Sequence, residues 1–296
     1  MVEIAAAYPA AAIAAAVILG LLVGSFLNVV IYRLPVIEKR QWKQMALDFI
    51  REEKLVDEAH IDETRFVSKD KFNLAIPRSR CPKCNSEINA LQNIPVISWL
   101  LLKGKCAGCQ TSISIRYPLI EMITGILTGY ALFHFGFTIA AAGAILLTWA
   151  LICLTMIDAD TYQLPDVITL PLLWAGILFN MFAVYTDLES AVIGAIAGYL
   201  VLWSVFWLFK LITGKEGMGY GDFKLLAALG AWCGWEALPT IILLSSVVGA
   251  VIGIFNIVVN GRDKAKPIPF GPYLAIAGLT SFYTGNAAVA ELIRSL

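Results

Sequence analysis

The sequence has unusually few charged residues for its length. Charged residues make up 15% of the 296 residues and hydrophobic residues 59%, whereas a soluble domain averages about 25% charged residues. This composition excludes an ordinary soluble domain and predicts a membrane protein that crosses the bilayer several times. The net charge is zero, so overall charge says nothing about nucleic acid or acidic ligands. No nucleic-acid partner is expected for this membrane protein.

Histidine is also scarce, and the common hydrolase motifs are absent. His60 and His134 are the only histidines, and neither a His-Glu-x-x-His nor a Gly-x-Ser-x-Gly motif occurs. These absences exclude a catalytic metal held by histidines and a serine nucleophile of that motif. The N-terminus carries Glu3 but no basic cluster, so the first apolar run is expected to remain as a transmembrane helix rather than to be cleaved as a signal peptide.

Long apolar runs predict an all-α polytopic membrane protein with about eight transmembrane helices, since roughly 20 apolar residues cross the hydrocarbon layer. A polar insert separates the first run from the second and is too charged to cross a bilayer. The predicted spans are Ala10–Ile31, Leu119–Phe135, Ile139–Ile157, Val167–Tyr185, Ala191–Phe209, Phe223–Trp235, Leu238–Val259 and Tyr273–Ala290.

The insert between the first two spans predicts both the domain organisation and the orientation. Residues Arg33–Arg116 hold 15 of the 22 lysines and arginines, so the positive-inside rule places them in the cytoplasm. Within the insert, Glu38–Lys71 is expected to form a charged amphipathic helix followed by a loop. The predicted domains are therefore a first transmembrane helix (1–32), a small cytoplasmic domain (33–116) and a transmembrane domain (117–296). The N-terminus is then expected outside the cytoplasm.

Four cysteines in the insert have the spacing of a zinc ribbon. Cys81 and Cys84 form one Cys-x2-Cys pair, and Cys106 and Cys109 form the second. Four thiolates complete a tetrahedral zinc site with no open position, so the zinc is predicted to be structural. A disulfide is disfavoured because the cytoplasm is reducing. The remaining two cysteines lie in apolar spans and are interpreted as small hydrophobic residues.

An aspartate stands at the entry to the sixth span. Asp222 lies in the stretch Gly219–Lys224, at the edge of the hydrocarbon layer, where a carboxylate is costly and commonly functional; helix capping is the alternative. The predicted topology places the turn containing Asp158, Asp160 and Asp166 on the same membrane face. Asp158 is favoured as the partner of Asp222 because it directly follows the apolar span, whereas the other two suit a solvated turn and a helix start.

Two neighbouring carboxyl groups can share one proton and hydrolyse an amide without a metal or a covalent intermediate. The residues therefore favour an aspartic peptidase. The alternative is a transporter in which Asp158 and Asp222 handle protons or cations, although both lie at one membrane edge and no inverted repeat is evident. Asn28, inside the first span, is interpreted as forming an interhelical hydrogen bond.

The order of these motifs resembles the bifunctional type IV prepilin leader peptidase/N-methyltransferase family. The resemblance covers nearly the whole chain, whereas the Gly-x-Gly-Asp motif alone is shared with presenilin-like intramembrane aspartyl proteases. The residues that carry it are Gly24–Asn28, the two cysteine pairs, Ile157-Asp158 with Leu164–Asp166, Gly219–Lys224 and Pro269–Tyr273.

The resemblance implies a specific activity and location. It implies cleavage of the basic leader of type IV prepilins and of type II secretion pseudopilins at the cytoplasmic face of the bacterial inner membrane. It also implies S-adenosylmethionine-dependent methylation of the new N-terminal residue, usually phenylalanine. Asp158 and Asp222 match the family's catalytic pair, and Gly104 matches a glycine linked to methyl transfer, although Gly104 also suits a loop of the zinc domain. The four cysteines match its zinc ligands; the oligomeric state is not predicted.

Overall fold

The computed structural model describes residues 8–53, 71–260 and 268–295. In these ranges the regular structure is helical, and the only β-type pairing is two isolated bridges. This confirms the predicted all-α class. The chain divides into two compact units: an N-terminal unit, Ala14–Gly129, and a C-terminal unit, Tyr130–Leu296, to which Met1–Ile13 also belongs.

The first helix, α2, is much longer than predicted. It runs without a break over Pro9–Glu52, so the predicted end at Ile31 and the separate helix beginning at Glu38 are wrong. The loop predicted after that helix falls in residues 54–70, which lie outside the described residues. The change in composition at Arg33 marks a change of surroundings and not the end of the helix. Pro35 lies inside α2; its missing N–H removes one i−4 hydrogen bond, yet the turns on both sides continue the helix.

The rest of the N-terminal unit contains the polar insert and the next helix. The 3-10 helix η2 (Leu91–Asn93) and the short helix α4 (Ile97–Leu101) follow the first cysteine pair. Helix α5 spans Arg116–Phe135, close to the prediction. Asn28 of α2 donates a hydrogen bond to the Tyr117 carbonyl at the start of α5, 3.2 Å away, which confirms the interhelical interpretation.

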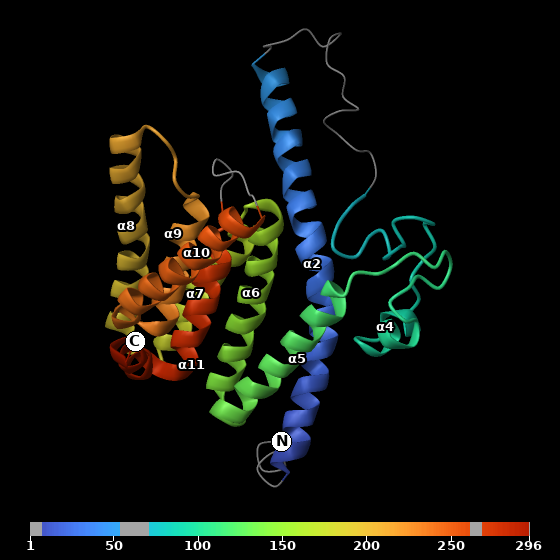
Figure 1. The fold of residues 1–296 in the computed structure, drawn as a ribbon, viewed down its shortest axis with the longest axis horizontal. Helices are drawn as coiled ribbons and strands as arrows, with labels where there is room; N and C mark the ends of the chain where they lie inside the picture. Colours follow the sequence, from blue (N-terminus) through green and yellow to red (C-terminus); the bar gives the residue numbers. More distant parts are fainter. Residues whose placement is uncertain (1–7, 54–70, 261–267, 296) are drawn as a thin grey trace. The chain divides into compact units, whose positions relative to one another are not determined.

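In the part of the C-terminal unit that the structure describes, six complete α-helices form a bundle (Figure 1). Each predicted span in this unit coincides with one helix, although the boundaries differ by several residues. The helices are α6 (Ile139–Thr161), α7 (Asp166–Asn180), α8 (Leu188–Thr213), α9 (Tyr220–Cys233), α10 (Leu238–Asn260) and α11 (Gly271–Ser295), with the 3-10 helix η3 (Trp235–Ala237) before α10.

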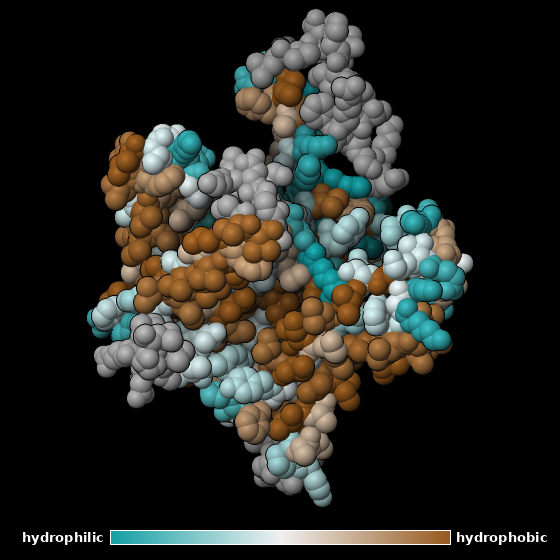
Figure 2. Space-filling view, in the orientation of Figure 1, coloured by the Kyte–Doolittle hydropathy of each residue, from teal (hydrophilic) through white to brown (hydrophobic). Residues whose placement is uncertain are grey.

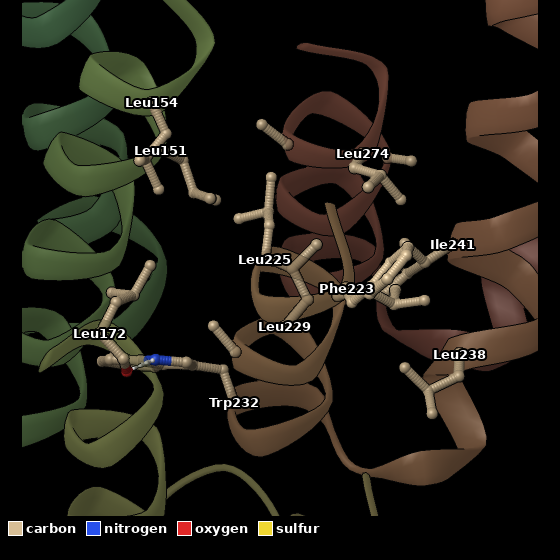
Figure 3. Packing of buried hydrophobic residues seen from close by; sticks show 14 of the residues in the cluster. Leu151, Leu154, Leu172, Phe223, Leu225, Leu229, Trp232, Leu238, Ile241 and Leu274 are labelled. Atoms are coloured by element: carbon tan, nitrogen blue, oxygen red, sulfur yellow. Dashed lines mark hydrogen bonds between the residues drawn. The ribbon is translucent and has the colours of Figure 1, made fainter. Parts of the chain in front are cut away.

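Helix α9 forms the centre of this bundle. Phe223 and all residues from Leu225 to Trp232 are buried, and they pack against α6, α7, α10 and α11 (Figure 3). The Trp232 indole N–H donates a hydrogen bond to the Leu172 carbonyl of α7, 2.8 Å away, which satisfies the one polar atom of this side chain. Because α9 is enclosed by other helices, the residues that follow Asp222 are held rigidly.

Helix α7 ends earlier than the predicted span Val167–Tyr185. The side chain of Asn180 accepts hydrogen bonds from the backbone N–H groups of Tyr185 and Thr186, and it donates one to the Ala231 carbonyl of α9. These bonds turn the chain back and terminate the helix. The apolar residues after Asn180 continued the hydrophobic run in the sequence, so composition alone placed the end too late.

Among the residues that the structure describes, five helices are long and apolar enough to cross a membrane: α2, α5, α6, α8 and the segment Trp235–Phe255. The predicted number of eight spans stays a prediction. Large hydrophobic side chains are exposed on them, and hydrophobic residues cover much of the face drawn in Figure 2. Soluble proteins rarely expose apolar patches of this extent. The chain is therefore a multi-pass membrane protein.

Candidate functional site

Asp158 lies in the last turn of α6 and is buried, with 5% of its surface exposed. Its side chain accepts a hydrogen bond from the backbone N–H of Gly271, the first residue of α11, at an N–O distance of 2.9 Å. Tyr162 adopts a left-handed conformation (φ 57°) and ends α6 by donating its N–H to the Asp158 carbonyl. The helix end and α11 together hold this carboxyl in place.

Asp222 lies in the first turn of α9 and is 6% exposed. The backbone N–H of Gly219 donates to its Oδ2 at 3.3 Å, so the capping interpretation is correct for one oxygen. Asp158 and Asp222 are thus both buried at a helix end, each with one carboxyl oxygen bound by a glycine N–H.

Leu164, in the turn between α6 and α7, packs against the start of α9 at Gly221 and against the start of α11 at Gly271. A methyl group added to Gly221 would lie 2.7 Å from Leu164 Cβ, and one added to Gly271 would lie 3.2 Å from Leu164 Cδ2 and 2.7 Å from Asp158 Oδ2. Only glycine allows this close approach. The two aspartates are thus held by one tightly packed junction of three chain segments.

The other two acidic residues of the turn do not join this junction. Asp160 is exposed, while Asp166 is the first residue of α7 and forms an ion pair with Lys224 of α9. The Lys224 Nζ lies 2.6 and 2.7 Å from the two carboxylate oxygens of Asp166. This pair links the α6–α7 turn to α9 beside Asp222.

The four cysteines of the insert form a second candidate site, in the N-terminal unit. Their Sγ atoms all lie within 4.8 Å of one another, with 3.7 Å between Cys81 and Cys109 and 3.9 Å between Cys84 and Cys106. Four sulfurs at about 2.3 Å from a tetrahedral zinc ion stand about 3.8 Å apart. Backbone N–H groups of Cys109 and Gly108 lower the pKa of Cys106 to about 6, which favours the ligating thiolate. The donor set and its geometry fit a structural metal site.

The two cysteine loops are copies of one another, displaced by 25 residues. In each, the first cysteine N–H donates to the carbonyl two residues beyond the second cysteine, and the residue after the second cysteine donates back. Ser86 and Thr111 place a hydroxyl 3.0 and 3.3 Å from the second sulfur of each loop. The shared pattern Cys-x2-Cys-Asn/Gln-Ser/Thr-x-Ile is the sequence signal that indicates this repeat.

Gly104 immediately precedes the second cysteine loop. Its φ is +67°, and a methyl group added to it would lie 2.9 Å from the Trp99 ring. Its N–H donates to the Trp99 carbonyl, and its carbonyl accepts from Ile113. These contacts give Gly104 a structural reason to be glycine. Cys153 is buried and Cys233 partly buried, both outside the four-cysteine cluster.

Sequence comparisons place these sites in a known context. Residues 18–135 match the bacterial peptidase A24 N-terminal domain, and residues 145–254 match the type IV leader peptidase family. The chain is 52% identical to a prepilin leader peptidase/N-methyltransferase of Stutzerimonas stutzeri over 293 residues, which is 99% of this chain and 98% of that protein.

Two further relatives carry the same name. The Pseudomonas aeruginosa protein is 50% identical over 286 residues (97% of this chain and 95% of the relative), and the Aeromonas salmonicida protein is 53% identical over 267 residues (90% and 89%). No solved structure matches the chain. With half of its residues identical to these proteins over almost their full length, the chain belongs to the type IV leader peptidase family.

Proposed function

We propose that this protein cleaves the leader peptide from type IV prepilins and type II secretion pseudopilins, and then methylates the new N-terminal amine. The observation that carries the peptidase assignment is the burial of Asp158 and Asp222 at the ends of two helices, beside one packed junction around Leu164. The printed name of the relatives, prepilin leader peptidase/N-methyltransferase, and the domain matches support both reactions.

In the proposed mechanism the two aspartates share the work of hydrolysis. The ionised carboxylate takes a proton from water while the water oxygen bonds to the scissile carbonyl carbon. The protonated carboxyl then gives its proton to the leaving nitrogen as the carbon–nitrogen bond breaks, which yields a carboxylic acid and an amine. The N–H groups of Gly219 and Gly271 each hold one carboxyl oxygen in place, which fixes the orientation of the pair.

A single experiment tests the two reactions together. Purified protein is incubated with a full-length prepilin, with and without S-adenosylmethionine, and the product masses are measured. Loss of the leader mass is expected in both samples, and a gain of one methyl group only in the sample with S-adenosylmethionine. An unchanged prepilin mass would contradict the peptidase assignment, and cleavage without methylation would contradict the second reaction.

The four cysteines are proposed to hold one structural zinc ion, which fastens the two copied loops of the insert. The ion supplies cross-linking and no open coordination position for substrate. Methyl transfer is assigned to the insert because Gly104, adjacent to Cys106 in the second loop, matches the family glycine. We keep the division into 1–32, 33–116 and 117–296 as the functional organisation of the chain.

The proposed topology has eight membrane-embedded helices, with the insert and both aspartates on the cytoplasmic side of the bacterial inner membrane. The lysine and arginine distribution supports this arrangement, because eight alternating spans would put the basic sequence stretches around Lys215 and Arg262 on the same side as the insert. A prepilin with a basic leader would then present its scissile bond at the depth of Asp158 and Asp222.

Substitutions of the two glycines in the Gly-x-Gly-Asp motif are expected to differ sharply. Gly221→Ala should lower the cleavage rate by about 10- to 100-fold, since small displacements of catalytic groups cost this much and the new methyl group would meet Leu164 at 2.7 Å. Gly219→Ala should stay close to wild type, because its methyl group would find no atom nearer than 3.9 Å. Equal rates for the two variants would contradict the packing at Leu164.

The ion pair between Lys224 and Asp166 predicts a measurable coupling. With exposed fractions of 28% and 55% for the two side chains, solvent screening limits its contribution to about 0.5–1 kcal/mol. Lys224→Gln and Asp166→Asn should each lower the free energy of unfolding, and the double variant should lose less than the sum. Thermal unfolding in detergent measures this cycle; strict additivity would show that the pair contributes nothing.

A further inference from the structure

Glu121 is a buried carboxyl group that neither proposed reaction uses. It lies in the second turn of α5 with 8% of its surface exposed. Its Oε2 accepts a hydrogen bond from the backbone N–H of Val96 at 2.7 Å, and the Ser25 hydroxyl hydrogen-bonds to the same carboxyl group. A carboxylate is costly to bury in a helix of a membrane protein, so its contacts indicate a specific role.

The close packing of α2 and α5 places Ser25 beside Glu121. A methyl group added to Gly24 would lie 2.7 Å from Glu121 Cα, so the two helix backbones touch at this point, as small residues permit in membrane helices. Asn28 strengthens the same contact through its bond to the Tyr117 carbonyl. The stretch Gly24–Asn28 thus forms the contact between α2 and α5 that fixes the position of the Glu121 carboxyl group.

On the other side of the carboxyl group, Val96 has an unusual backbone. Its φ is 59° and its ψ −50°, a conformation that a β-branched residue rarely adopts and that persists only where surrounding contacts enforce it. Val96 is the N-cap residue of α4, and no side chain caps this helix. The hydrogen bond to Glu121 is the contact that holds the Val96 N–H, and with it the start of α4.

Helix α4 connects this contact to Gly104. Trp99 of α4 accepts the Gly104 N–H at its carbonyl, 2.9 Å away, and its indole N–H donates to the Ile113 carbonyl at 3.1 Å. Ile113 in turn donates to the Gly104 carbonyl at 2.7 Å. A shift of Val96 would therefore move Trp99, and the backbone on both sides of Gly104 would follow.

We propose that Glu121 is a positioning residue for methyl transfer, which holds α4 and Gly104 in their working arrangement through the Val96 N–H. The proposal rests on the proposed function, because the link between Gly104 and methyl transfer comes from family resemblance. Glu121 lies in the N-terminal unit and the two aspartates in the C-terminal unit, so the two activities should separate.

The test compares Glu121→Ala and Glu121→Gln in the purified full-length protein, with the exposed Glu87→Gln as the matched control. Loss of the acceptor should lower kcat for methylation of a pre-cleaved pilin by about 10-fold or more, while leader cleavage stays within about 2-fold. The glutamine oxygen can still accept the Val96 N–H, so Glu121→Gln should recover most of the methylation rate. Glu87→Gln should match wild type in both assays.

Two outcomes would overturn the proposal. Normal methylation by Glu121→Ala would show that the contact is dispensable, and equally poor methylation by Glu121→Gln would show that the negative charge itself is required. If Glu121→Ala does not accumulate, Ser25→Ala decides: loss of methylation with retained cleavage supports the proposal, and any other result contradicts it. Wild-type protein that cleaves but never methylates would instead overturn the proposed second reaction and this inference together.

Discussion

Asp158→Asn and Asp222→Asn are each expected to lower the rate of leader cleavage by at least about 100-fold, since positioned acid–base groups typically contribute 10²- to 10⁴-fold. An amide can neither take a proton from the attacking water nor donate one to the leaving nitrogen. Each change removes one member of a pair that acts as a unit, so the double variant should be little worse than either single variant. Cleavage of a full-length prepilin, followed by mass spectrometry, measures the loss.

The control for this prediction is available on the same turn. Asp160 is exposed and two residues from Asp158, so Asp160→Asn should cleave at close to the wild-type rate. Both inactive variants should still insert into the membrane and should still methylate a pilin that was cleaved beforehand. Normal cleavage by either Asp158→Asn or Asp222→Asn would disprove the catalytic pair.

The burial of Asp158 could be predicted from the residues next to it in the sequence. Asp158 follows an uninterrupted apolar run, so its buried position at the C-terminal end of a helix was predictable, as was the solvated position of Asp160. The N–H donor that holds Asp158 was not: Gly271 lies 113 residues further along the chain, and only the packing of α11 brings it there. Pro269–Tyr273 had appeared only as part of the family resemblance.

Helix ends were predicted less well than helices, for identifiable reasons. A change from apolar to charged residues marks the edge of a membrane layer, but α2 continues beyond it as far as Glu52. Conversely, α7 stops at Asn180 within an apolar run because that amide binds two backbone N–H groups of the following turn. In the first case the helix crosses between environments, and in the second a tertiary contact overrides composition.

The sequence alone does not distinguish Glu121, because a single acidic residue near the start of an apolar span is typical of a span boundary. Its role depends on the contact between α2 and α5 at Gly24 and on the backbone N–H of Val96, 25 residues away along the chain. The signal that could have exposed it is the stretch Gly20–Gly24, whose glycines are spaced as in close-packed membrane helices. Where two helices pack this closely, an acidic side chain buried in their contact is expected to have a polar hydrogen-bonding partner.

The second large effect is expected at the four-cysteine site. Cys81→Ser or Cys106→Ser should reduce bound zinc from about one ion per chain to near zero, because a tetrahedral site missing one thiolate loses both a bond and the fit of the remaining ligands. Both sulfurs are buried, so water cannot substitute without opening the cluster. Zinc content after dialysis, measured by atomic emission, tests the prediction, and methylation should fall in parallel.

Cys153→Ser serves as the matched control, because Cys153 lies in α6 and is not part of the cluster. The zinc content of this variant should equal that of the wild-type protein. The copied loops sharpen the expectation: each supplies two ligands and closes its own backbone hydrogen bonds, so the metal is the link between them. Removing the metal should let the two loops move relative to each other while the C-terminal unit stays folded. In every cysteine variant of the cluster, the leader-cleavage rate should therefore keep a larger fraction of its wild-type value than the methylation rate does. Unchanged zinc in Cys81→Ser would require a different ligand set, and equal loss of both activities would show that the two units depend on the same metal.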